Sequence, residues 1–167
     1  MGTILLWLFA APVPGQNREE REYRHRAGAG FGFTFIPLAG ELGDTDARGL
    51  FVPSLRLDYF FHLYPRWAIG FMANYELDHY MIIQEQIERD HALGLTLVGM
   101  FDITRHLGLF TGAGVEIEPH RHLGVFRLGT EYSIELGRSW TLVPRVYFDL
   151  KKNYNTWSFA LTLSKEF

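Results

Sequence analysis

The chain has 167 residues, a net charge of −3 and no cysteine, so it has room for one domain and cannot form a disulfide or a thiolate metal site. Apolar residues make up 47 % and aromatic residues 16 %, with 17 glycines, a mixture that strands favour and long helices avoid. The chain has no excess of basic residues, so its charge does not indicate a nucleic-acid partner.

The first predicted element is a targeting segment. Ile4 to Ala11 is an apolar run that is too short for a membrane-spanning helix, which needs about 20 residues. Small residues and Pro14-Gly15 follow the run, so we predict that residues 1–15 are the remnant of a signal peptide. Residues 16–26 are charged and lack an apolar period, and we expect a short flexible lead-in there, followed by one folded domain over 27–167.

Beyond the lead-in, apolar side chains alternate with small or polar ones, which is the period of a β-strand with one apolar face. No later segment has the 18 consecutive apolar residues of a membrane helix. Each strand is close to the length of a tilted membrane strand, about 9–11 residues. The alternation predicts eight strands, over 30–35, 54–63, 67–77, 93–103, 107–117, 126–136, 140–150 and 157–164.

The connections between these strands alternate in length. Tight turns with an arginine, at 64–67, 104–107 and 137–140, exchange with longer polar segments at 38–49, 78–90, 118–122 and 151–155. This asymmetry is typical of membrane barrels, with short periplasmic turns and longer outer loops. Within the second long segment, residues 80–83 are apolar, and we expect them to extend a strand beyond the membrane.

Alternation alone fits two kinds of barrel, because the apolar face points inward in a soluble barrel and outward in a membrane barrel. The alternation is strict, which favours the membrane barrel: among the apolar-phase positions only Lys165, near the chain end, is charged. A charge facing lipid costs about 2–4 kcal/mol at mid-membrane. A soluble, lipocalin-like ligand-binding barrel is the alternative at the level of the fold.

Glycine and aromatic residues also favour the membrane barrel. Glycine is unusual on a solvated strand face but fits a face that crowds a narrow lumen. The glycines of that phase are Gly28, Gly30, Gly32, Gly70, Gly94, Gly108, Gly112, Gly114 and Gly129. Aromatic residues collect near strand ends, as in interfacial girdles. We predict one girdle of Tyr64, Trp67, Phe101, Trp140 and Phe167, and a second of Phe35, Tyr75, Phe148, Tyr154 and Trp157.

Pro144 departs from this pattern. It lies on the apolar phase inside a predicted strand, where a closed barrel has no edge for a residue without an N–H. We therefore expect a bulge or an early strand end at Pro144.

The C-terminal segment resembles a known signal. Its apolar set, Trp157, Phe159, Leu161, Leu163 and Phe167, resembles the signal that the barrel-assembly machinery reads in outer-membrane proteins. Residues 57–59, 67–70, 127–132 and 154–157 are similar to a group of small outer-membrane β-barrel proteins found in Bacteroidetes. The resemblance covers roughly 31–167 and implies a location and a fold, but no reaction.

The inward face carries the candidate functional residues. They are Arg56, Asp58, Glu76, Asp102, Glu116, Arg127, Glu131, Glu135, Arg145 and Asp149. An eight-stranded barrel is just wide enough for side chains to fill it, and charges in that space must be paired. We therefore predict a salt-bridge network that plugs the lumen. The acidic excess leaves a narrow, cation-preferring pathway as the alternative.

Histidines and serines offer little further chemistry. His120 and His122, two residues apart in a predicted outer hairpin, are weak candidates for a metal ion, and solvated loop residues are the favoured interpretation. Barrels of this size include lipid A palmitoyl transferases and deacylases, which need a constellation such as His with Ser. No His-x-Ser arrangement occurs in the chain, so we predict no enzyme, no catalytic residue and no cofactor.

These observations predict an all-β protein, an eight-stranded, antiparallel, up-and-down transmembrane β-barrel in a Gram-negative outer membrane. Both termini are expected in the periplasm, because an even number of strands returns the chain to its starting side. The expected role is structural, adhesive or as a subunit of an assembly, with a plugged lumen. The expected partners are outer-membrane lipid, the assembly machinery and an unidentified envelope protein; the alternative role is a narrow pathway for small solutes or cations.

Overall fold

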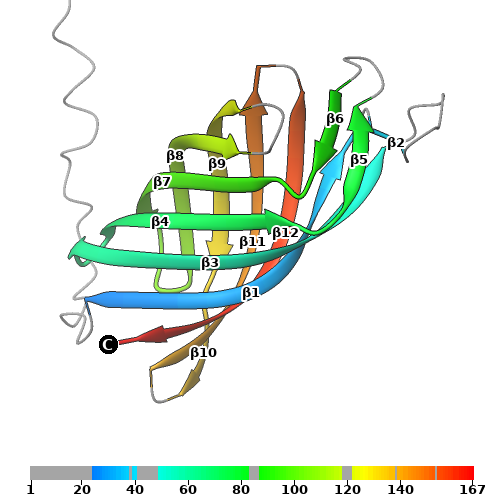
Figure 1. Ribbon diagram of the computed structural model, residues 1–167. Coiled ribbons are helices and arrows are strands. Elements are labelled where there is room, and N and C mark those ends of the chain that lie inside the picture. The colour runs from blue at the N-terminus through cyan, green and yellow to red at the C-terminus, as the bar shows by residue number, and fades with distance from the viewer. Residues whose placement is uncertain are drawn as a thin grey trace, which may run out of the picture.

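The computed structural model describes residues 24–37, 39–40, 49–82, 87–117, 122–137, 139–152 and 154–167. All regular elements among them are strands (Figure 1). The strands are β1 (His25–Ile36), β2 (Ala39–Gly40), β3 (Leu50–Tyr64), β4 (Trp67–Glu76), β5 (His79–Ile82), β6 (Ile87–Asp90), β7 (Leu93–Asp102), β8 (Leu107–Ile117), β9 (Leu123–Tyr132), β10 (Ile134–Gly137), β11 (Trp140–Lys151) and β12 (Asn155–Glu166). The described residues include no helix long and apolar enough to cross a bilayer.

The main sheet closes on itself. Its order is β1-β3-β4-β7-β8-β9-β11-β12, and every neighbouring pair is antiparallel. β12 pairs with β1 over ten positions, from Arg26 opposite Glu166 to Phe35 opposite Trp157, which joins the last strand to the first. Because β10 continues the line of β9, the wall has eight strands, and the predicted closed, antiparallel, eight-stranded barrel is confirmed.

The two ends of the barrel differ as predicted. At the terminal end, where His25 and Phe167 lie, the connections are tight turns, and the last of them places Gly137 and Ser139 at positive φ angles of 95° and 67°. The opposite end, here called the hairpin end, carries the longer connections. There β5 pairs with β6 and with β2 in a small second sheet that extends beyond the barrel wall (Figure 1). The predicted strand extension is confirmed for 80–82, and Ile83 lies outside the described residues.

The prediction for Pro144 is wrong in its location. β11 runs through Pro144 without a bulge and pairs with β12 in one register, with Pro144 opposite Leu161. The interruption lies on the other side, where β9 ends at Tyr132 and β10 begins at Ile134 in the same register against β11. Ser133 in this gap faces β8, where its amide donates to the His106 carbonyl and continues the register of β8 with β9.

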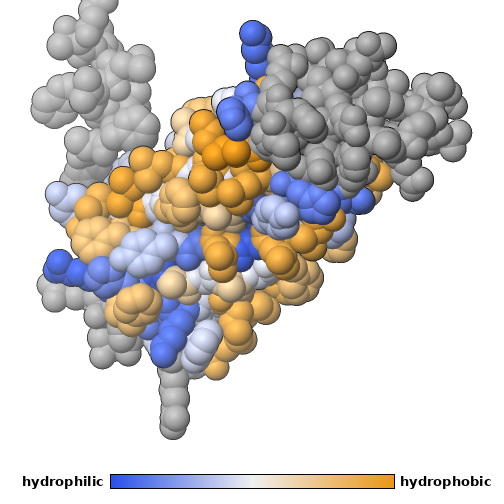
Figure 2. All heavy atoms as spheres, in the orientation of Figure 1, coloured by the Kyte–Doolittle hydropathy of each residue, from blue (hydrophilic) through white to orange (hydrophobic). Residues whose placement is uncertain are grey.

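Burial along each strand follows the predicted alternation, with the apolar side chains outside. Leu57 is 63 % exposed and Leu97 58 %, whereas Arg127 is 1 % exposed. Figure 2 shows hydrophobic side chains over much of the visible barrel wall. This phase is the inverse of a soluble barrel, in which the charged face meets water. The lipocalin-like alternative is therefore contradicted by the direction of the side chains.

Aromatic side chains gather at both ends of the outer wall. Trp67 packs on Phe101 at the terminal end, with ring centroids 4.8 Å apart, and Phe148 packs on Trp157 at the hairpin end, at 4.7 Å. One predicted girdle member is wrong, because Tyr154 points into the lumen and is 3 % exposed. It lies just before β12 begins and shares the phase of the buried Thr156 and Ser158, opposite to that of Trp157, so the alternation itself places it in the lumen.

Two rows of glycine bend the sheet. A Cβ added to Gly30 would collide with the backbone of Leu161 on β12, and one added to Gly112 would collide with the backbone of Leu97 on β7. β1 and β8 are four strands apart in a ring of eight, so these two bends face each other. They bring the β3–β4–β7 wall towards the β9–β11–β12 wall and leave a narrow lumen.

The predicted boundary of the lead-in is also wrong. The signal-peptide segment 1–15 and most of the lead-in lie outside the described residues, but β1 already begins at His25. Arg26 is 1 % exposed inside the lumen, so its charge belongs to the interior and not to a solvated linker. The charge at Arg26 concealed the period, which Gly28, Gly30 and Gly32 continue on the same face.

Candidate functional site: the polar lumen

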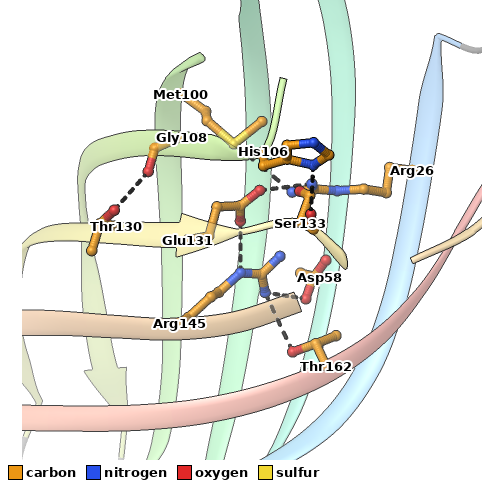
Figure 3. A network of polar contacts seen from close by, with 10 residues as sticks. All are labelled: Arg26, Asp58, Met100, His106, Gly108, Thr130, Glu131, Ser133, Arg145 and Thr162. Atoms are coloured by element: carbon orange, nitrogen blue, oxygen red, sulfur yellow. Dashed lines mark hydrogen bonds and ion pairs between the residues drawn. The ribbon is translucent and has the colours of Figure 1, made fainter. Parts of the chain in front are cut away.

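A first ion cluster lies near the terminal end of the lumen (Figure 3). Arg145 on β11 contacts Asp58 on β3 at 2.5 Å and Glu131 on β9 at 2.7 Å. Arg26 on β1 contacts the second oxygen of Glu131 at 2.7 Å. All four side chains are at most 2 % exposed, so these charges from four strands are neutralised by one another and not by water.

A second cluster lies in the centre. Arg127 on β9 donates two hydrogen bonds to the Asp149 carboxylate, at 2.7 and 2.8 Å, in the bidentate geometry that favours arginine. Its Nη2 also donates to the Asn74 side chain on β4 at 3.0 Å, so this hydrogen bond crosses the lumen from β9 to β4. Arg56 on β3 donates to Ser54 at 3.1 Å, and the Arg56 and Arg127 guanidinium groups both lie against the Tyr147 ring.

A third cluster lies towards the hairpin end. Lys151 pairs with Glu116 at 2.6 Å, and the Tyr154 hydroxyl donates to the other oxygen of Glu116 at 2.9 Å. Next to it, four buried side chains form an apolar cluster across the lumen: Ile36, Val52, Leu123 and Tyr154. Among the described residues, polar contacts and apolar packing thus occur at the terminal end, in the centre and towards the hairpin end of the lumen, as expected for a barrel of eight strands.

Most of the predicted charge network lies where the sequence placed it. The buried members are Arg56, Asp58, Glu76, Asp102, Glu116, Arg127, Glu131, Arg145 and Asp149. Glu135 is a correction: it lies on β10, where all four residues are exposed, because β10 extends past the lumen at the terminal end. Alternation gives the correct phase for Glu135 but does not show where the lumen ends.

Sequence reasoning missed two cations of the lumen. Arg26 was placed in the lead-in and Lys151 in a loop, yet both are buried in ion pairs. The signal was present, since Lys151 follows Arg145, Tyr147 and Asp149 at the same period of two. With these additions the described lumen holds five cationic side chains and six carboxylates, all buried. The acidic excess that motivated a cation pathway is therefore nearly absent.

The weak metal candidates gain no support. His120 lies outside the described residues, and His122 is exposed just before β9. Among the residues that the structure describes, no group of three or more His, Asp or Glu side chains could hold a metal ion. The absence of an enzymatic activity and of a cofactor stays a prediction.

The predicted C-terminal signal forms the outer face of β12. Trp157, Phe159, Leu163 and Phe167 are 45–55 % exposed, and Leu161 is half-buried between them. Phe167 stacks on His25 of β1, with ring centroids 5.6 Å apart, and the two residues exchange both backbone hydrogen bonds. The signal residues thus also close the seam between the first and last strands.

Comparison with known proteins finds no matching family model and no matching curated protein. Solved structures do match. Ail, the attachment invasion locus protein of Yersinia pestis, superposes with a TM-score of 0.57 at 10 % identity, covering 87 % of this chain and 99 % of that chain. Neisserial surface protein A matches with a TM-score of 0.51 at 11 % identity, over 86 % and 97 %.

The outer membrane protein OprG of Pseudomonas aeruginosa matches in the same way, with a TM-score of 0.51 at 13 % identity, covering 87 % of this chain and 96 % of that chain. At these identities the likeness establishes a shared fold. That fold is the one used by small outer-membrane barrels, over nearly the whole length of both chains. The resemblance to the Bacteroidetes group stays a prediction.

Proposed function

We propose that this protein spans a Gram-negative outer membrane, with both termini in the periplasm. The inverted phase supports this, because an apolar wall around a charged interior is stable only where hydrocarbon surrounds the wall. The aromatic residues at both ends support it as well, since such rings favour the two membrane interfaces. Short turns at the terminal end support a periplasmic position for that end.

The test of location is fractionation of expressing cells together with gel mobility. The protein is expected in the outer-membrane fraction, in a form whose mobility changes on boiling, as a detergent-resistant barrel unfolds. Recovery of a detergent-free monomer from the soluble fraction would contradict the proposal.

We infer that the role is structural, adhesive or as a subunit of an assembly, and not the passage of solutes. The observation that carries this inference is the set of three buried ion clusters, joined at the hairpin end by the apolar cluster of Ile36, Val52, Leu123 and Tyr154. A solute would have to break several desolvated ion pairs to pass.

Planar bilayers test this inference directly. The purified protein is expected to give no steady conductance. Well-defined, cation-selective steps would favour the alternative, a narrow pathway, in which the lumen opens in the membrane. A variant that removes one of the ion pairs, Lys151→Met, serves as the comparison, because a plugged barrel should become leakier when a plug residue is lost.

Adhesion is the role for which a structural relative offers a precedent. Ail is named as an attachment invasion locus protein, and it has been solved with the heparin analogue sucrose octasulfate. In this chain β5 and β6 pair with each other at the hairpin end and form, with β2, a small sheet apart from the barrel wall (Figure 1). Replacing the hairpin with a tight turn should leave the barrel in the membrane. Under an adhesive role, it should abolish attachment of expressing cells to their target surface.

Besides membrane lipid, the barrel-assembly machinery is a proposed partner during biogenesis. The outward face of β12 presents aromatic and aliphatic residues from Trp157 to Leu163 and again at Phe167, with Lys165 between them. A stably bound envelope protein would fit the role of an assembly subunit. Cross-linking from exposed positions at the hairpin end would identify such a partner.

A further inference from the structure

One cation in the centre of the lumen is not paired with a carboxylate. Arg56 is 4 % exposed, and among the described residues its guanidinium has only a hydrogen bond to Ser54 and the face of Tyr147. Its Nε has no hydrogen-bond partner. Burying a guanidinium without a counter-charge is costly, so this position calls for a compensating group.

Other unused donors lie in the lumen. Nη1 of Arg127, Nη2 of Arg145 and the hydroxyl of Tyr147 are buried and have no partner among the described residues. The guanidinium carbons of Arg56 and Arg127 lie 4.7 and 4.1 Å from the centre of the Tyr147 ring. Arg127 also bonds Asn74, the residue directly across from Arg56 on β4, so the two arginines meet in one region.

We propose that the centre of the lumen binds one small monovalent anion of halide size, held by Arg56, Arg127 and Tyr147. The unused groups of the two arginines can only donate hydrogen bonds, and the Tyr147 hydroxyl can donate as well. An anion accepts from all of them. A water molecule would have to find acceptors for its own two hydrogens. The filled lumen limits the anion to a small one.

The local charge supports an anion although the lumen as a whole has one carboxylate more than it has cations. Asp149 is chelated by Arg127, and Glu131 is paired with both Arg26 and Arg145. Asp58 is paired with Arg145 through one oxygen, and its Oδ1 has no hydrogen-bond partner among the described residues. The remaining carboxylates lie at the ends of strands, Glu76 and Glu116 towards the hairpin end and Asp102 towards the terminal end. In the centre, Arg56 is therefore a cation without a direct ion pair among the described residues, although the charges of Asp149 and Glu76 act on it.

Sodium bromide is the probe for this site, because bromide can be located by its anomalous scattering. Crystals of the barrel grown in bromide should show an anomalous peak within hydrogen-bond reach of the Arg56 Nε. Density for water without anomalous signal at that position, or bromide bound elsewhere only, would overturn the proposal.

A solution experiment provides a second readout. The urea midpoint of unfolding should be higher in sodium chloride than in sodium gluconate of equal ionic strength, because an anion bound only to the folded state stabilises it. Arg56→Met removes the unpaired charge without leaving a carboxylate unpaired, so the variant should fold and lose the chloride effect. Lys165→Met, at an exposed cation beside Trp140, is the matched control and should keep it.

Two results of this experiment would contradict the site. One is a wild-type protein with the same midpoint in both salts, and the other is an Arg56→Met variant that responds to chloride as the wild type does. The inference needs only the folded barrel, so its failure would leave the proposed envelope role untouched.

Discussion

The central ion pair of the terminal-end cluster can be tested by removing its arginine. In Arg145→Met the side chain keeps its approximate length and loses its charge. Among the described residues Asp58 then has no cation, since Arg145 is its only ion-pair partner there and its other oxygen has no hydrogen-bond partner. Glu131 keeps Arg26 at 2.7 Å. Breaking a buried pair from one side costs about 3–5 kcal/mol, and the remaining Arg26 contact places the expected loss near about 3 kcal/mol.

The double variant Arg145→Met with Asp58→Asn decides whether this loss comes from the orphaned charge. Once Asp58 is neutral, no charge is left unpaired, and about 2 kcal/mol of the loss should be recovered, because removing both partners of a buried pair is far less costly than removing one. An exposed cation on a turn, Arg105, provides the control, and Arg105→Met should change stability by less than about 0.5 kcal/mol.

The assay is urea unfolding in phospholipid vesicles, followed by tryptophan fluorescence and by gel mobility without boiling. The free energy of unfolding is compared among the four proteins. A single variant as stable as the wild type, or a double variant as unstable as the single one, would refute the reasoning that these charges are desolvated and mutually neutralised.

Three further changes test the wall. Gly112→Ala should cost about 1–3 kcal/mol in the same unfolding assay, because its Cβ would meet the Leu97 backbone, whereas Gly124→Ala, with nothing within 4 Å, should be neutral; equal effects would contradict the bend at β8. Leu97→Arg should cost about 2–4 kcal/mol in a bilayer and Leu97→Met almost nothing; a tolerated arginine would place this position in water. Phe167→Ser should slow insertion and leave chain in the periplasm, measured by pulse-chase fractionation, while Tyr64→Ser at the same end should not; unchanged kinetics would argue against the assembly signal.

The alternation of apolar and polar residues with a period of two predicted most of the fold. This signal is strong because the two faces of each strand are chemically distinct. A shift of one residue in a strand would turn its outward leucines into the lumen and its buried arginines towards the outside. The same rule located Arg127, Glu131 and Arg145 in the lumen. Their partners could not be assigned, because a contact such as Asp58 with Arg145 depends on barrel diameter and strand stagger, which alternation does not encode.

The ends of the strands were the weakest part of the sequence-based prediction. Arg26, Lys151 and Tyr154 lie beyond the predicted strands yet inside the lumen, while Glu135 lies inside a predicted strand yet outside the lumen. In each case the chain continues in the same phase, and the tilt of the strand decides where the interior ends. Pro144 is a further example, because β11 runs through it in one register and the interruption lies at Ser133 on the neighbouring strand.

The most direct test of the account asks which face of the strands meets hydrocarbon. Because the chain has no cysteine, single cysteines can be introduced at the outward Leu57, Leu97 and Leu128 and labelled with a fluorophore before refolding into vesicles. The membrane barrel predicts quenching of all three labels by brominated lipid chains and none by aqueous iodide. Quenching by iodide alone, with a protein that stays monomeric without detergent, would contradict it.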